Sequence, residues 1–237
     1  MKQVYFYTGS FTHTFYKEIF KYPPEGYQFI PSSPDLKSDA IKKDIVQSKQ
    51  WYFPYLRKGE GAIVSALAKM RTPKLRLIRH PKCDLIHSAQ YPLLNRHPWV
   101  LDFEDVSAFT WYRREVLDSP FVKRTLEWLL SSPYCRAILP WTEAARKSLE
   151  NGLDCSRFRD KIRVVYPVMT PQPDIEAIFQ EKRAQKKIKI LFVGTAFYAK
   201  GGVEALAVVD ELSKQYPLEF VMISNVPEEY RKRYESN

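Results

Sequence analysis

Short apolar runs alternate with amphipathic stretches along most of this sequence, and this alternation limits the folds that it can adopt. Strand-like runs lie at residues 3–9, 27–30, 83–89, 99–103, 136–139 and 162–166. Helical patterns lie at residues 11–22, 62–70, 109–117 and 121–130, and another follows the expected N-cap Thr142. Because parallel strands need long crossover connections, this order predicts an α/β domain with a doubly wound parallel sheet.

A proline-rich break divides the chain. Pro167, Pro171 and Pro173 lie close together and precede a polar stretch that is expected to be a spacer helix. The strand–helix pattern then restarts, with strands at residues 188–193 and 218–223. We therefore expect a first domain over residues 1–166, a linker over 167–187 and a partial second domain over 188–237. A two-stranded sheet is only marginally stable by itself, so the second part should pack against the first part or against another chain.

The charge of the chain is concentrated in its first part. The chain of 237 residues carries a net charge of +10, and residues 171–237 hold ten basic and ten acidic side chains, which cancel. A field of this sign attracts nucleic acid, an acidic membrane surface or phosphorylated substrates. A solvated basic surface without a partner is the alternative.

Composition excludes several other classes of protein. The aromatic content of 14% argues against a disordered chain, and no apolar run approaches the ~18 residues of a membrane span. The N-terminus lacks a signal-peptide pattern. Cys83, Cys135 and Cys155 show no CxxC spacing, which argues against a disulfide framework and against a zinc site. We expect a cytoplasmic protein without a metal.

Several segments together resemble a known enzyme family. KIRVVYPV, a linker and then KIKILFVGTAFYAKGGVEAL resemble the hinge and second-domain start of the GT-B glycosyltransferases, specifically the large retaining group called family four. Residues 84–87, 98–105 and 138–149 are similar to the acceptor domain of that family. The resemblance implies two Rossmann-like domains across a cleft. It also implies transfer of a hexose from a nucleotide-diphosphate sugar to a sugar or lipid-linked acceptor, with retention, with assistance from the donor phosphate and without a metal.

The resemblance assigns a loop to the donor. It implies that Gly194, Thr195, Lys200 and Gly201 hold the diphosphate, although Thr195 stands where the family often has arginine. A strand that runs through a glycine into a helix N-terminus presents backbone N–H groups to an anion, which supports this assignment. The alternative is a tight strand-to-helix turn without a ligand.

Polar residues after the first strands are candidates for the acceptor side. His87 is expected to end its strand, and Glu104 and Asp105 follow the run 99–103. Carboxylates are costly to bury, so those of Asp102, Glu104 and Asp105 should face a polar cleft. Glu104 stands where the family often has a histidine. A structural histidine and a helix cap are the alternatives for His87 and Asp105.

Two further segments are weaker candidates. Gly9 and Ser10 follow the first strand, where the family packs a loop near donor and acceptor. Residues 37–58 interleave lysines with aromatic side chains, as in segments that lie on an anionic membrane surface. We predict membrane or acceptor contact by Lys42, Lys43, Lys49, Trp51 and Arg57. The membrane would be contacted at its inner face. Buried packing of this segment is the more favoured alternative, and contact with single-stranded nucleic acid is the least favoured.

The family's most diagnostic motif does not occur in this sequence. That motif is a pair of glutamates separated by seven residues, and Glu228, Glu229 and Glu235 do not supply it. We therefore expect a chain truncated within the second domain, or one completed by another chain. One alternative is a non-catalytic basic binding or partner subunit derived from a glycosyltransferase. Another is a metal-dependent transferase of a different fold that uses Asp102 and Glu104.

Overall fold

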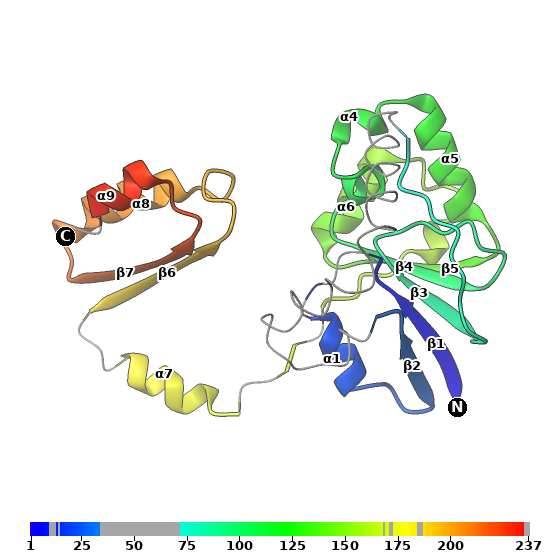
Figure 1. Ribbon diagram of the computed structural model, residues 1–237, viewed down its shortest axis with the longest axis horizontal. Coiled ribbons are helices and arrows are strands. Elements are labelled where there is room, and N and C mark those ends of the chain that lie inside the picture. Colours follow the sequence, from blue (N-terminus) through cyan, green and yellow to red (C-terminus); the bar gives the residue numbers. More distant parts are fainter. Residues whose placement is uncertain are drawn as a thin grey trace, which may run out of the picture. The chain divides into compact units, whose positions relative to one another are not determined.

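The computed structural model describes residues 1–9, 13, 15–33, 72–167, 169–170, 173–183 and 187–234. The chain divides into two units, Met1–Thr170 and Pro171–Asn237, which Figure 1 colours from blue to yellow-green and from yellow to red. Each unit is described by itself.

The first unit is built on a five-stranded parallel sheet. Its strands are β1 (Lys2–Tyr7), β2 (Tyr27–Pro31), β3 (Leu85–Ala89), β4 (Trp99–Phe103) and β5 (Cys135–Pro140). The strand order is β2-β1-β3-β4-β5, one of the two common orders of doubly wound, Rossmann-like sheets. The predicted α/β class with a parallel sheet is therefore confirmed. The order reverses between β1 and β3, and such a switch point is where these sheets bind ligands.

The strand predicted at residues 162–166 was wrong. Ile162 forms one isolated bridge with Ile138, and the backbone N–H groups of Arg163 and Val165 donate to β5 carbonyls at 2.9 and 3.0 Å. Val165 and Tyr166 are largely exposed. Only Ile162 reaches the core here, so little apolar burial holds the segment in a regular ladder.

The helices in the described part of the first unit are α1 (Tyr16–Lys21), η2 (Val106–Thr110), α4 (Arg114–Leu117), α5 (Pro120–Ser131), α6 (Glu143–Gly152) and η3 (Arg159–Lys161). The first begins at Tyr16, later than the helix predicted over 11–22, and the helix predicted over 62–70 lies outside the described residues. Pro120 opens α5, and the Thr142 hydroxyl caps α6 by accepting from the Ala145 N–H at 3.0 Å. The single helix predicted at 109–117 is instead η2 and α4, because Trp111 and Tyr112 adopt the left-handed conformation between them.

Two apolar clusters cover opposite faces of this sheet. Side chains that are paired in register point to the same face, so Ile86 and Trp99 lie on one face and Phe6 and His87 on the other. Ile86 and Trp99 belong to the larger cluster, which includes Leu126 of α5. Phe6 belongs to the smaller cluster, which α1 covers through Tyr16. Both faces are therefore buried, as in other parallel sheets.

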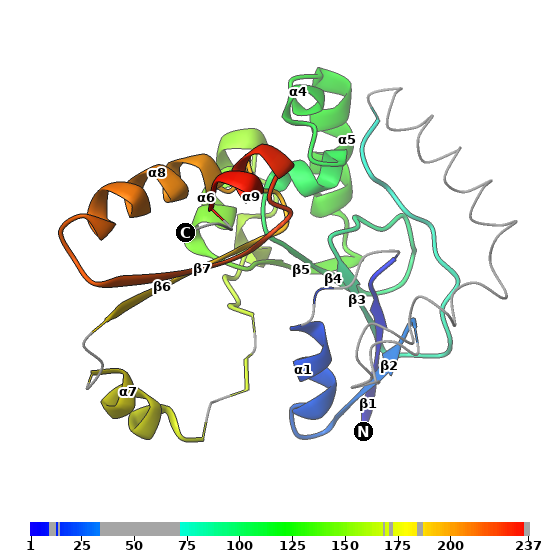
Figure 2. The same ribbon diagram turned by 60° about the vertical axis from the view of Figure 1, so that its left-hand side comes forward.

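The described residues of the second unit form two parallel strands and three helices. They are α7 (Ile175–Arg183), β6 (Ile188–Gly194), α8 (Gly202–Ser213), β7 (Leu218–Ser224) and α9 (Glu228–Tyr234). Figures 1 and 2 show α8 and α9 over the same face of the β6–β7 sheet. On alternate positions of both strands, four apolar side chains are exposed: Leu191, Val193, Val221 and Ile223. Among the described residues, no helix is long and apolar enough to cross a membrane.

Candidate functional site at the carboxyl edge of the first sheet

The switch point between β1 and β3 has a close backbone approach at Gly9. This residue follows β1 with a φ of 61°, a conformation that favours glycine. A Cβ atom there would lie 2.6 Å from the Tyr91 ring. Gly9 is therefore required both by its φ and by the ring beside it. Ser10, predicted with it, lies outside the described residues.

Three residues at this edge adopt the left-handed conformation although they are not glycine. Gln90 follows β3 with a φ of 63°, and Trp111 and Tyr112 have φ values of 59° and 61°. Each costs about 1–2 kcal/mol relative to an ordinary backbone conformation. Such strain persists where the surrounding structure enforces it, often at functional sites.

One of the strained residues, Tyr112, contacts both Glu104 and Gln90. The Tyr112 hydroxyl lies within hydrogen-bonding distance of Glu104 Oε1 and 3.0 Å from Gln90 Oε1. Burial, followed by the carboxylate of Glu104, raises the pKa of Tyr112 above its usual range, so the hydroxyl stays protonated and can donate. It has one proton to donate, so one of the two acceptors can turn to another partner. The sequence identified Glu104 and missed Gln90 and Tyr112, whose backbone conformation leaves no signal in a single sequence.

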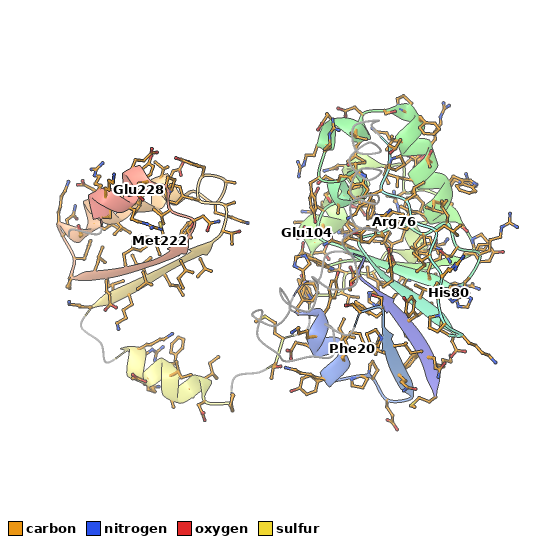
Figure 3. The ribbon with its side chains drawn as sticks, viewed as in Figure 1. Phe20, Arg76, His80, Glu104, Met222 and Glu228 are labelled. Carbon is orange, nitrogen blue, oxygen red and sulfur yellow. The ribbon has the colours of Figure 1, made fainter. Side chains whose placement is uncertain are left out.

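Two cations lie over the same two aromatic rings, and one of them, Lys74, interacts electrostatically with Glu104. The Lys74 ammonium lies 4.0 Å from the centroid of the Tyr91 ring and 5.3 Å from that of Trp111. The Arg76 guanidinium lies 5.5 and 5.7 Å from the same two rings. Figure 3 labels Arg76 and Glu104 in this part of the first unit. In the sequence, both cations belong to a stretch from residue 57 to residue 82 that holds eight basic side chains and one acidic side chain.

Lys74 is the buried member of this group. Its side chain is almost fully enclosed. Burial and the nearby Arg76 charge lower the pKa of Lys74 to about 8, against a smaller opposing effect of Glu104. Among the described residues neither Lys74 nor Arg76 forms an ion pair. A cation that is desolvated without a paired carboxylate favours an anionic or electron-rich ligand.

Asp102 lies inside the first unit, and the prediction that its carboxylate faces a cleft was wrong. It is 5% exposed. It accepts from the Tyr16 hydroxyl at 2.7 Å and lies 2.8 Å from His87 Nε2. These two partners offset the cost of burying the carboxylate. Burial and the charge of Asp102 raise the pKa of Tyr16 above its usual range, so Tyr16 stays a neutral donor.

The prediction that His87 ends its strand was wrong. His87 occupies the middle of β3 (Leu85–Ala89), because the strand begins two residues later than Cys83 and continues to Ala89. Its ring packs against Phe6 at 4.4 Å between centroids and contacts Asp102. His87 therefore orients a buried network, and a role for it on the acceptor side stays a prediction.

Asp105 forms the helix cap that the sequence offered as its alternative role. Its carboxylate accepts from the Ser107 N–H at 2.9 Å at the start of η2, and it pairs with Arg114 at 3.1 Å. Burial raises the pKa of Asp105, but the hydrogen bonds from Ser107 and the charge of Arg114 outweigh this effect and lower it overall. Glu104 and Asp105 are neighbours in sequence with different hydrogen-bond partners.

In the second unit, the loop after β6 folds back on its own strand. A Cβ atom on Gly194 would lie 3.1 Å from Lys200 Cγ, so the Lys200 stem lies against the last residue of β6. Gly201 caps α8 with a φ of 76°, and a Cβ on Gly202 would lie 2.4 Å from the Phe197 ring. Thr195 lies in the same loop. The structure thus brings Gly194, Lys200 and the start of α8 together.

The predicted membrane or acceptor surface lies outside the described residues. This applies to every residue that was proposed for it, namely Lys42, Lys43, Lys49, Trp51 and Arg57. Contact with a membrane therefore stays a prediction.

Comparison with known proteins gives structural likeness only. No protein-family model matches the sequence, and no curated protein matches it. Among solved structures, the chain is similar to Anabaena Alr3699/HepE in complex with UDP and glucose, at 11% identity and a TM-score of 0.43. The same protein in complex with UDP-glucose matches at 11% identity and a TM-score of 0.40. Both alignments cover 94% of this chain and 69% of the other.

Proposed function

We propose that this chain is a glycosyltransferase, or part of one, that transfers a hexose from a nucleotide-diphosphate sugar to an acceptor hydroxyl with retention. The observation that carries the proposal is the loop between β6 and α8. There, Lys200 and the capping glycine Gly201 lie together at the start of a helix of 12 residues. The helix dipole and the lysine cation together match the charge of a diphosphate. The N–H groups of Gly201 and Gly202 donate to the Tyr198 and Phe197 carbonyls, so the backbone donors to the ligand would be those that follow in the first turn of α8.

The acceptor is proposed to bind at the carboxyl edge of the first unit. Glu104 offers carboxylate oxygens for a sugar hydroxyl, and the Tyr91 and Trp111 rings offer apolar faces for the C–H groups of a sugar. In the transfer, the acceptor oxygen bonds to the anomeric carbon while the bond from that carbon to the diphosphate oxygen breaks. The proton of the acceptor hydroxyl passes to the departing diphosphate, and Glu104 orients the hydroxyl.

The donor half is tested by calorimetric titration of the full chain with UDP, GDP and ADP without metal. One of the three should bind saturably. Lys200→Ala should weaken that binding about tenfold, which corresponds to a loss of ~1.4 kcal/mol of binding free energy. Lys214→Ala is the matched control, because Lys214 is the C-cap of the same helix and pairs with Glu211. No binding in a folded protein would overturn the donor assignment and favour the non-catalytic subunit.

The acceptor half is tested by turnover with the nucleotide-sugar that the titration identifies. Glu104→Gln should lower turnover about 10²-fold, because the acceptor hydroxyl loses the carboxylate that orients it, and should leave nucleotide affinity unchanged. Glu115→Gln is the control, since Glu115 is a half-exposed residue of α4 paired with Arg113. Unchanged turnover in Glu104→Gln would remove Glu104 from the mechanism.

A further inference from the structure

We infer that His80, Cys83 and His97 form a transition-metal site, with zinc as the metal that suits them best. Cys83 lies two residues before β3, and His97 lies two residues before β4. The strands β3 and β4 are neighbours in parallel register, with Ile86 opposite Trp99. The sheet therefore brings together two residues that are 14 positions apart in the sequence.

The distances in this group match a tetrahedral centre. Cys83 Sγ lies 3.6 Å from His80 Nδ1 and 3.6 Å from His97 Nε2. A zinc ion with about 2.3 Å to sulfur and about 2.05 Å to nitrogen separates S and N by about 3.6 Å in a tetrahedron. The ligand atoms of all three residues lie within 4.8 Å of one another, so the two rings need only small rotations to bring both nitrogens to the metal.

The three side chains also meet without a metal. The Cys83 thiol can donate to one histidine nitrogen and accept an N–H from the other, and both nitrogens lie 3.6 Å from the sulfur. The two rings also lie against each other, with centroids 4.6 Å apart and planes at 37°. All three side chains are partly buried. A bound cation with one thiolate and two neutral imidazoles would hold all three groups at once.

The residue types indicate which metals fit. Thiolate and imidazole together suit Zn²⁺ and its spectroscopic substitute Co²⁺, whereas Mg²⁺ and Ca²⁺ take oxygen ligands. His80 Nδ1 also lies 2.9 Å from the Pro81 carbonyl oxygen. Because Nδ1 is also the nitrogen that faces Cys83 Sγ, it would give up its proton and this contact on binding the metal, and Nε2 would keep the proton of the neutral ring. Three protein ligands leave a fourth position for water or another ligand.

This group is separate from the candidate site of the proposed transfer. It lies at the amino ends of β3 and β4, whereas Glu104 follows the carboxyl end of β4. Figure 3 shows His80 and Glu104 on different sides of the first unit. The spacing of the cysteines gives no sign of this site, because two of its three ligands are histidines and one of them, His97, comes close to Cys83 only in the folded sheet. We assign the site a structural role, in which the metal fixes the two segments that lead into β3 and β4.

The test is titration of the full chain, purified without a histidine tag and treated with chelator, with Co²⁺ and then Zn²⁺. One Co²⁺ per chain should give a thiolate-to-cobalt charge-transfer band and intense visible bands of a tetrahedral centre, and Zn²⁺ should displace it. Cys83→Ser should abolish the charge-transfer band. His80→Gln and His97→Gln should each weaken Zn²⁺ binding at least about tenfold in a chelator competition.

The matched control is Cys155→Ser, because Cys155 is a buried thiol elsewhere in the first unit. It should keep the charge-transfer band. A folded wild-type protein without the band would overturn the site, as would a band that persists in Cys83→Ser. Activity of the transferase is not part of this readout, so the result does not depend on the proposed function.

Discussion

In the first unit the parallel sheet is buried on both faces, whereas the two-stranded sheet of the second unit has helices on one face and four exposed apolar side chains on the other. Only Phe197 and Leu206 are buried apolar residues in the described part of the second unit. Two-stranded sheets with so little burial are marginal alone. The first unit should therefore set the stability of the chain, and the second should unfold more readily.

The largest expected effect is the loss of a core side chain in the first unit. Leu126 of α5 is fully buried in the larger cluster, so Leu126→Ala should lower the free energy of unfolding by about 2–5 kcal/mol. Tryptophan fluorescence in a urea titration reports this, because all five tryptophans belong to the first unit: Trp51, Trp99, Trp111, Trp128 and Trp141. An unchanged urea midpoint in Leu126→Ala would contradict the burial of Leu126 in the larger cluster.

The next effect concerns the buried ammonium of Lys74. Its pKa is about 8, below the ordinary 10.5, so between these values the unfolded state binds more protons than the folded state. The free energy of unfolding should therefore rise with pH across this window, by at most about 3 kcal/mol. The cation–π contact with Tyr91 reduces the gain.

Urea titrations at a series of pH values check this prediction. The rise should be absent in Lys74→Met and present in Lys147→Met, a change at an exposed position of α6. A rise of equal size in Lys74→Met would show that another group causes it.

A smaller effect should follow from removing one hydrogen bond in the buried network. Tyr16→Phe leaves Asp102 with His87 alone and should cost about 1.5–3 kcal/mol, as for hydrogen bonds to charged groups. Tyr22→Phe is the control, because Tyr22 is 58% exposed. Equal stability of both variants in urea titrations would mean that the Tyr16–Asp102 contact does not form.

The smallest effect is expected on the exposed face of the second unit. Val193 of β6 is 64% exposed, so Val193→Ala should change stability by no more than about 0.5 kcal/mol. Hydrogen exchange of the β6 amides measures this locally, without relying on tryptophan. If Val193→Ala lowered the stability of β6 by several kilocalories per mole, this face would be covered in solution. The two units would then differ less in how well their sheets are buried.

Strands were easier to predict from the sequence than contacts between them. The runs that became β3, β4 and β5 are dense in buried apolar residues, which is a local property of the sequence. Residues 162–166 have a similar composition, but Val165 and Tyr166 remain exposed and no ladder forms. Burial is decided by tertiary packing, and a single sequence does not contain that information.

The candidate site shows the same limit. Glu104 was identified because a carboxylate follows an apolar strand, whereas Lys74, Gln90 and Tyr112 reach it through the loops of the first unit. His80, Cys83 and His97 likewise meet only because β3 and β4 pair in parallel. For Asp102, the sequence indicates a carboxylate that needs polar partners, but not that its side chain points inward to Tyr16.

The position of β1 inside the sheet, between β2 and β3, also constrains the order in which this protein folds. Its partner β2 follows within about two dozen residues, but Val4 pairs with Leu85 on its other side. Closing a loop of that length is entropically costly and slow compared with local contacts. During synthesis, β1 and β2 would emerge as a pair whose inner edge stays open until β3 has left the ribosome. Chaperone dependence of this protein should therefore arise early in translation, before its core exists.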